Sequence, residues 1–248
     1  MACLSSLAET ETNIKSIFLT DKVNQAGCYA VKLWVDGTER VVVVDDLFPF
    51  DPYKEEWAFS RSKQNEIWVL LLEKAWAKVF GSYFRIENGS SIEAFSALTG
   101  APTLEISHEQ FYWDYSNLWK EIARADQENL SMVACSAQGG EGMVQDLTYS
   151  LLAAVDVNLG CFRSEKLMLI RNPWGFKEWS GDWSDSSDIW KKYPHALKSI
   201  EKAMGKKFDK SYLSMNPEDG LFWISLKDYL KFFDKTTICF NYENRKHT

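Results

Sequence analysis

Four apolar, strand-like segments follow one another in the second half of the chain and restrict the folds that it can adopt. They are residues 130–138, 148–157, 166–174 and 220–233, the last of which turns helical. Short apolar runs bounded by turn-forming residues are typical of β-strands. The third run, KLMLIRNPW, ends in a tight, tryptophan-lined corner at Asn172 and Pro173. We therefore expect a β-rich second half.

The first half has a different pattern. Apolar residues alternate on either side of Asp36-Gly37, which predicts a β-hairpin with a tight turn. Strong helix formers at helical spacing then predict helices that end at glycines, and an amphipathic helix follows a hinge-like break at residues 101–103. The expected helices are residues 65–83, 91–100 and 107–127, and residues 190–215 are expected to form a lysine-rich surface helix and loop.

This layout predicts an α+β fold in two lobes. The first, helical lobe is residues 1–100, and the second, β-rich lobe is residues 101–248. The apolar segment at residues 2–8 is expected to be the tail of a helix in the first lobe, with part of that lobe's core missing before it. Its apolar face is therefore expected to be exposed, and the stability of the chain modest.

Charge and cysteine content exclude several classes of function. The net charge of −7 and the pI near 5.1 argue against nucleic acid as the main partner. The chain has no apolar run long enough to span a membrane and no secretory signal. Its five cysteines are odd in number and lack zinc-site spacing. We expect free thiols and a reducing, cytoplasmic location.

Five blocks, in the same order, resemble the protease core of the calpain family. The block LIRNPWGFKEWSGDWSD, residues 169–185, is similar to the family's Arg-Asn-Pro-Trp-Gly and Glu-Trp-x-Gly-x-Trp-x-Asp run. The other four are VVVVDDLFPFD, EIWVLLLEKAWAKVFGSY, EAFSALTG and EDGLFWISLKDYLKFF, and together the blocks span nearly the whole chain. The resemblance implies a papain-like fold of two lobes and a cysteine protease.

The resemblance also implies roles for particular residues. Asn172 would orient the catalytic histidine, and Trp174 would shield that hydrogen bond. The family's nucleophilic cysteine would lie about three residues before Met1, so we expect an N-terminally truncated core. Cys3 is an alternative nucleophile, although a small buried residue is the simpler interpretation. In a site without histidine, Asn172 has the alternative role of capping a turn before Pro173.

The histidine of the family has no counterpart in this chain. In GMVQDLTYSL, residues 142–151, Leu147 stands at the position of the family's histidine, and leucine carries no proton. A cysteine thiolate needs an imidazole partner, since the free thiol has a pKa of about 8.5. The other histidines, His108, His195 and His247, are expected to be solvated and not catalytic.

Calpain cores carry one calcium site in each lobe. In the first lobe only Glu66 matches a ligand position. In the second lobe Glu178, Asp185 and Asp219 match, the carbonyl of Pro217 would add an oxygen, and Leu221 replaces a glutamate. Calcium prefers six to eight oxygen ligands, so only weak calcium binding is expected. The alternative is that these carboxylates are ordinary solvated loop residues.

Three functions remain open on the sequence. The first is a calpain-like protein without catalysis that acts by binding or scaffolding, with a protein or peptide in an inter-lobe cleft lined by Trp174, Trp179 and Trp183. The second is a fragment of an active calcium-dependent cysteine endopeptidase that performs limited intracellular proteolysis. The third is a structural module followed by further domains of a longer chain.

Overall fold

The computed structural model describes residues 1–248 except 24, 61–65, 161, 214–215, 217–218 and 243–248. It divides into two compact units, which we describe separately. The large unit combines Met1–Glu9 with Ala101–Thr248, and the small unit is Thr10–Gly100. The division between Gly100 and Ala101 lies at the expected lobe boundary. Residues 1–9, however, group with residues 101–248.

The small unit is built on a β-hairpin. Strands β1 (Cys28–Val35) and β2 (Thr38–Asp45) pair around Asp36 and Gly37, both of which have positive φ, as the predicted tight turn requires. One face of β1 is buried through Tyr29, Val31 and Leu33. The remaining elements are α2 (Glu11–Lys15), β3 (Phe50–Asp51), β4 (Glu56–Trp57), α3 (Trp68–Phe80), η1 (Phe84–Ile86) and α4 (Ser91–Thr99).

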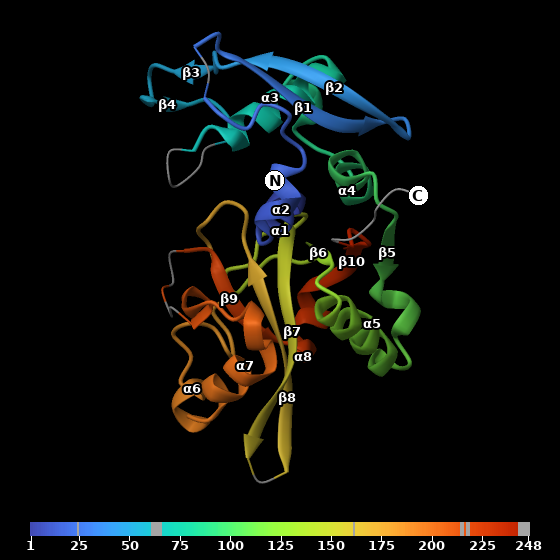
Figure 1. The fold of residues 1–248 in the computed structure, drawn as a ribbon. Helices are drawn as coiled ribbons and strands as arrows, with labels where there is room; N and C mark the ends of the chain where they lie inside the picture. Colours follow the sequence, from blue (N-terminus) through green and yellow to red (C-terminus); the bar gives the residue numbers. More distant parts are fainter. Residues whose placement is uncertain (24, 61–65, 161, 214–215, 217–218, 243–248) are drawn as a thin grey trace. The chain divides into compact units, whose positions relative to one another are not determined.

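An antiparallel six-stranded sheet forms the large unit, in the order β5-β10-β6-β7-β8-β9 (Figure 1). Its strands are β5 (Thr103–Ser107), β6 (Ser131–Ser136), β7 (Thr148–Gly160), β8 (Arg163–Arg171), β9 (Leu221–Ser225) and β10 (Phe233–Cys239). Its helices are α1 (Ala2–Ala8), η2 (His108–Phe111), α5 (Tyr115–Gln127), α6 (Ile189–Lys192), α7 (Ala196–Met204), η3 (Gly205–Lys207), η4 (Lys210–Leu213) and α8 (Leu226–Phe232).

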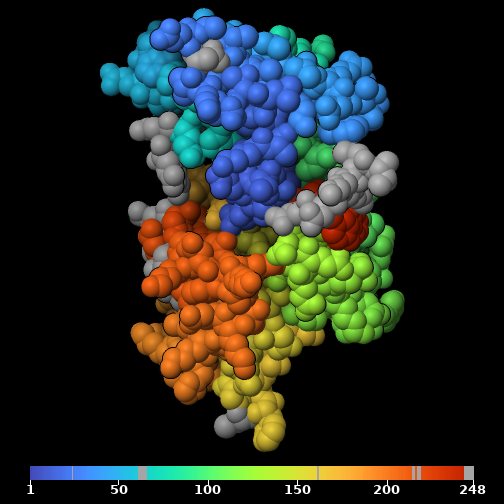
Figure 2. Space-filling view, in the orientation of Figure 1, coloured from blue at the N-terminus to red at the C-terminus, as the bar shows by residue number. Residues whose placement is uncertain are grey.

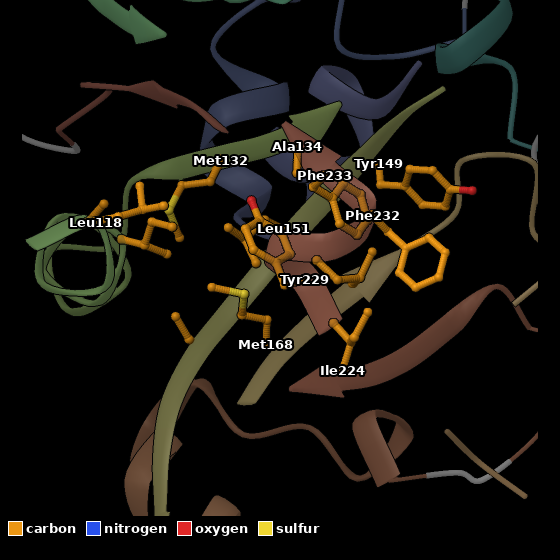
Figure 3. Close-up of a cluster of buried hydrophobic side chains, with 14 of the residues drawn as sticks. Leu118, Met132, Ala134, Tyr149, Leu151, Met168, Ile224, Tyr229, Phe232 and Phe233 are labelled. Atoms are coloured by element: carbon orange, nitrogen blue, oxygen red, sulfur yellow. The ribbon is translucent and has the colours of Figure 1, made fainter. Parts of the chain in front are cut away.

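The central strands are apolar throughout because both faces of the sheet are covered. In β8, Met168 and Ile170 join one buried cluster, and Leu167 and Leu169 join the other. The first cluster packs with α5 and α8, and Figure 3 shows part of it, including Leu118, Met168 and Tyr229. The second packs with α6 and α7. The four predicted strands are confirmed, whereas β5 was not predicted: only its first and last residues fall in the expected break and helix, and residues 104–106 were assigned to no element.

Two expectations about exposure were wrong. Helix α1 buries Ala2, Cys3, Leu4 and Leu7, because it packs on β6 and β7. The hydroxyl of Ser6 accepts a hydrogen bond from the Met132 amide at 3.0 Å. The apolar face of this helix is therefore not exposed. The lysine-rich segment also contributes to the core, since Trp190, Ala196 and Ile200 are buried in the second cluster.

Candidate functional site

Leu147 and Asn172 lie at the same end of the strand pair β7–β8. The two strands are antiparallel, and Ser150 lies opposite Arg171. Leu147 directly precedes β7, and Asn172 directly follows β8. The two positions that the resemblance assigns to the histidine and its orienting asparagine therefore lie at the same end of this strand pair.

Asn172 is buried, with an exposed fraction of 1%, and its side chain is used within its own loop. Its Oδ1 accepts a hydrogen bond from the Trp174 amide at 2.9 Å. Its Nδ2 donates to the carbonyls of Phe176 and Lys177, at 2.7 and 2.9 Å. An amide group has two N–H donors, and both are engaged here. This geometry is that of a loop-closing asparagine.

Leu147 is half-buried and packs against the first apolar cluster. Its carbonyl accepts a hydrogen bond from the Ser136 amide at 2.9 Å, and its own amide donates to the Ser136 hydroxyl at 3.2 Å. The backbone is thus held on β6, while the side chain supplies only apolar contact. No group at this position can transfer a proton.

His108 is buried, which corrects the expectation that it is solvated. Its Nδ1 lies 2.8 Å from the Phe233 carbonyl, and its Nε2 lies 2.8 Å from Oγ1 of Thr236. Because a carbonyl only accepts, Nδ1 carries the proton and Nε2 accepts from Thr236. Burial lowers the pKa of His108. Both ring nitrogens are therefore engaged away from Asn172. His195 is exposed, and His247 lies outside the described residues.

The tryptophans of the corner differ in environment. Trp174 is half-exposed and stacks on Phe176, with ring centroids 5.9 Å apart. Trp179 and Trp183 are buried in the two apolar clusters. They therefore cannot line an open cleft, and the expectation that they do was wrong. Their burial follows from the sheet, which has an apolar face on each side to cover.

Three carboxylates from two loops of the large unit converge. Glu178, Asp185 and Asp219 each place an oxygen within 4.8 Å of the others. The Gly220 amide donates to Oε1 of Glu178 at 2.6 Å, and the Leu221 amide donates to Oδ1 of Asp219 at 2.9 Å. The side chain of Leu221 is buried in the second apolar cluster and supplies no ligand. Among the described residues, the cluster therefore consists of these three carboxylates.

Asp185 is the least satisfied member of this cluster. Its Oδ2 is buried and has no hydrogen-bond partner among the described residues. Burial, together with the charges of Glu178 and Asp219, raises the pKa of Asp185 to about 7. A buried, partnerless carboxylate oxygen between two other carboxylates is the environment that a bound cation would neutralise. The described residues thus fit a calcium ion, and they supply three of the six to eight ligands that calcium prefers.

The remaining proposed ligands lie elsewhere or outside the described residues. Glu66, in the small unit, is exposed and accepts a hydrogen bond from Nε1 of Trp68 at 2.9 Å. Among the described residues it joins no carboxylate cluster. Pro217 is outside the described residues. Cys3 is buried in α1, as the simpler interpretation of that residue predicts.

Gly142 allows the loop before Leu147 to lie against the loop that carries Glu178, a role that was not predicted from the sequence. It has φ of +87°, and a Cβ at this position would lie 1.6 Å from the Glu178 carbonyl oxygen. The neighbouring Glu141 carbonyl accepts a hydrogen bond from the Ser180 amide at 2.9 Å. Only a residue without a side chain allows this approach. Two adjacent glycines before Glu141 were the only signal in the sequence.

Comparison with known proteins gives consistent matches. The family model described as "Calpain family cysteine protease" matches residues 1–240. "Calpain-type cysteine protease ADL1" of Oryza sativa is 34% identical over 239 residues, which is 91% of this chain and 10% of that protein. "Calpain-1 catalytic subunit" of Homo sapiens is 33% identical over 254 residues, 96% of this chain and 33% of that protein.

A third relative, "Calpain-B" of Drosophila melanogaster, is 34% identical over 234 residues, 87% of this chain and 23% of that protein. The chain spans about a tenth of the length of the plant relatives and about a third of the human one. No helix within the described residues has the length and hydrophobicity that a membrane span requires.

Proposed function

The chain belongs to the calpain family of cysteine proteases, and from this premise we propose that it is a protease domain without catalysis that acts by binding or scaffolding. Membership in the family also confirms the α+β fold of papain-like type. The chain spans only part of these longer relatives, so an activity, substrate or partner like theirs is a proposal for this chain. Its location is proposed to be the cytoplasm.

Leu147 carries this proposal. A cysteine protease requires a base that takes the thiol proton and returns it to the leaving amine, and leucine has no such group. Two observations support the proposal. The side chain of Leu147 packs on the apolar cluster, and the amide of Asn172 is occupied by its own loop. His108 is held by Phe233 and Thr236, so it does not replace the missing base.

The binding role is proposed for the exposed aromatic pair Trp174 and Phe176. These rings stack beside the Asn172 turn and present apolar surface to solvent. Stacked aromatic side chains on a hydrogen-bonded turn are pre-ordered, which lowers the entropic cost of holding an extended peptide. The proposed partner is therefore an unstructured protein segment.

Matched aromatic pairs test this binding role. Trp174→Ala with Phe176→Ala is expected to weaken binding of a fluorescent, unstructured casein by about tenfold or more. The control pair is Tyr112→Ala with Trp113→Ala, since those rings are also exposed and in mutual contact. Equal loss of binding in both variants, or no loss in the first, would contradict the proposal.

An active calcium-dependent endopeptidase is the alternative. The corner from Arg171 to Trp174 favours it, because the positions of the family's orienting asparagine and shielding tryptophan are both kept there. In that case the activity would depend on parts of a longer protein that this chain does not contain.

Two experiments bear on these functions. The first is hydrolysis of casein by the purified chain with and without calcium, for which both functions predict no cleavage. The second is the mass of the endogenous protein, detected with an antibody against residues 190–215. If that mass greatly exceeds 28.6 kDa, the longer protein is assayed with Leu147 and with Leu147→His.

The longer protein is expected to be inactive with Leu147 and to gain activity with histidine. A Leu147→Gln control, polar but without a titratable group, is expected to stay inactive. Calcium-dependent cleavage by the Leu147 form would refute the proposal and establish the alternative.

Calcium binding by Glu178, Asp185 and Asp219 is proposed as a structural feature of either function. A bound cation would neutralise three converging charges and join the loop after β8 to the turn before β9. The buried Oδ2 of Asp185 supports the proposal. The absence of a fourth carboxylate at Leu221 supports weak binding.

A further inference from the structure

Lysines gather in one stretch of a chain whose net charge is −7. Residues 190–211 contain seven lysines and only two acidic residues, Glu201 and Asp209. This stretch includes α6, α7, η3 and η4, all on the face of the sheet that the second apolar cluster covers. A basic region in an acidic chain concentrates positive potential on one face.

Helix α7 separates its apolar and basic sides. Ala196, Ile200 and Met204 recur every four residues and are buried. Lys198 and Lys202, also four residues apart, are exposed on the opposite side. Within the described ranges, the lysines of this stretch that form ion pairs are Lys191, with Asp188, and Lys207, with Asp126. The exposed lysines at 192, 198, 202, 206 and 210 form none there.

An exposed aromatic residue lies on the same part of the molecule. Phe162 is at the turn between β7 and β8 and is fully exposed, and Arg163 beside it is exposed too. The hydroxyl of Ser199 in α7 accepts a hydrogen bond from the Asn158 amide of β7 at 2.8 Å. At roughly 3.3 Å per residue, Phe162 lies within about 13 Å of this contact. Figure 1 shows strands β7 and β8 extending past α7, and Figure 2 shows the yellow end of these strands and the orange segment that contains α7 at the surface.

We propose that this basic face, made of the exposed lysines of residues 191–210 and the Phe162 tip, binds the surface of an anionic phospholipid bilayer. Lysines on one face attract acidic headgroups, and a protruding aromatic ring inserts at the headgroup boundary. An acidic protein segment would satisfy the lysines but gives no reason for a projecting phenylalanine. The two features together therefore favour the bilayer.

Vesicle co-sedimentation of the 248-residue chain tests the proposal. Binding is expected to vesicles of phosphatidylcholine with about 30% phosphatidylserine, to be absent from pure phosphatidylcholine, and to fall as salt rises. Lys198→Gln with Lys202→Gln is expected to weaken partitioning about 25-fold. Phe162→Asn, which suits the positive φ of that position, is expected to weaken it about tenfold.

The control removes two exposed lysines from the other side of the sheet. Lys120→Gln with Lys227→Gln changes the net charge equally, on α5 and α8, and is expected to leave partitioning within about twofold. Equal loss in both double variants, or no binding to the anionic vesicles, would overturn the proposal. So would tight binding of polyglutamate that is unaffected by Phe162→Asn, which would assign the face to an acidic protein.

Discussion

Asn172 contributes to the fold with every hydrogen-bonding group of its side chain. Asn172→Ala removes a buried side chain and leaves the Trp174 amide and the Phe176 and Lys177 carbonyls without these partners. We expect the free energy of unfolding to fall by about 2–4 kcal/mol in urea denaturation. The exposed Asn117→Ala serves as the control, with an expected change within about 0.5 kcal/mol. Equal, small effects would contradict the loop-closing role.

His108 gives the stability of the large unit a specific pH dependence. Its pKa is lowered in the folded state, so the unfolded chain binds more protons below the ordinary value of 6.5. The stability that the neutral ring provides is therefore complete above pH 6.5 and is lost as pH falls through the lowered value. Protonation would make Nε2 a donor to Oγ1 of Thr236, which lies 2.6 Å from the Tyr229 hydroxyl, so one of these two buried hydroxyl protons would lose its acceptor.

The variant His108→Gln tests this dependence. Asp126 and Asp185 have raised pKa values and give the opposite slope, so the readout is the difference between wild type and variant. We expect the stability advantage of the wild type, measured by urea denaturation, to shrink steadily below pH 6.5. A difference that is constant between pH 7.5 and pH 5 would show that His108 does not titrate on unfolding.

At the scale of elements, the loop before β7 and the loop after β8 depend on one close approach. Gly142→Ala would place a methyl group against the Glu178 carbonyl, and we expect a loss of about 3 kcal/mol or more. Gly140 is the matched control, because it also has positive φ but its Cβ would meet nothing within 4 Å. Gly140→Ala is expected to cost about 1–2 kcal/mol. The free energies of unfolding of both variants are measured by urea denaturation. Equal losses would mean that the contact between Gly142 and the Glu178 carbonyl is not what requires glycine.

The elements differ in how well the sequence predicts them. Strand β8 was predictable because a strand buried on both faces is apolar at every position. The same holds for the hairpin turn at Asp36-Gly37, whose chemistry is local. The burial of His108 was not predictable from the sequence, because its partners Phe233 and Thr236 are 125 and 128 residues away. The convergence of Glu178 and Asp219 followed only from a family resemblance, because spacing alone does not bring two loops together.

For the whole molecule, calcium is expected to act as a stabilising ligand. Millimolar calcium should raise the melting temperature of the wild-type chain, measured by calorimetry, by mass action on the folded state. Asp185→Asn should raise the melting temperature without calcium, because it removes a buried charge, and should abolish the calcium response. Glu66→Gln is the control and should keep the response. A response that survives Asp185→Asn would place the ion elsewhere.

The grouping of α1 with residues 101–248 makes a second prediction at this scale. Leu7 in α1 is fully buried, and Leu7→Ala is expected to cost about 2–5 kcal/mol. Hydrogen exchange should accelerate in β6 and β7, on which α1 packs, and stay unchanged in β1 and β2. Leu33→Ala, in the small unit, should give the reverse pattern. Acceleration in β1 and β2 with Leu7→Ala would mean that α1 belongs to the small unit.

The same grouping determines the order in which the chain can mature on the ribosome. Residues 10–100 make up the whole small unit, so this unit can fold as soon as they have been synthesised. Helix α1 is synthesised before the small unit, yet the strands on which it packs, β6 and β7, emerge more than a hundred residues later. The burial of α1 therefore waits until after the small unit can have folded, and until then its apolar face is available to a chaperone.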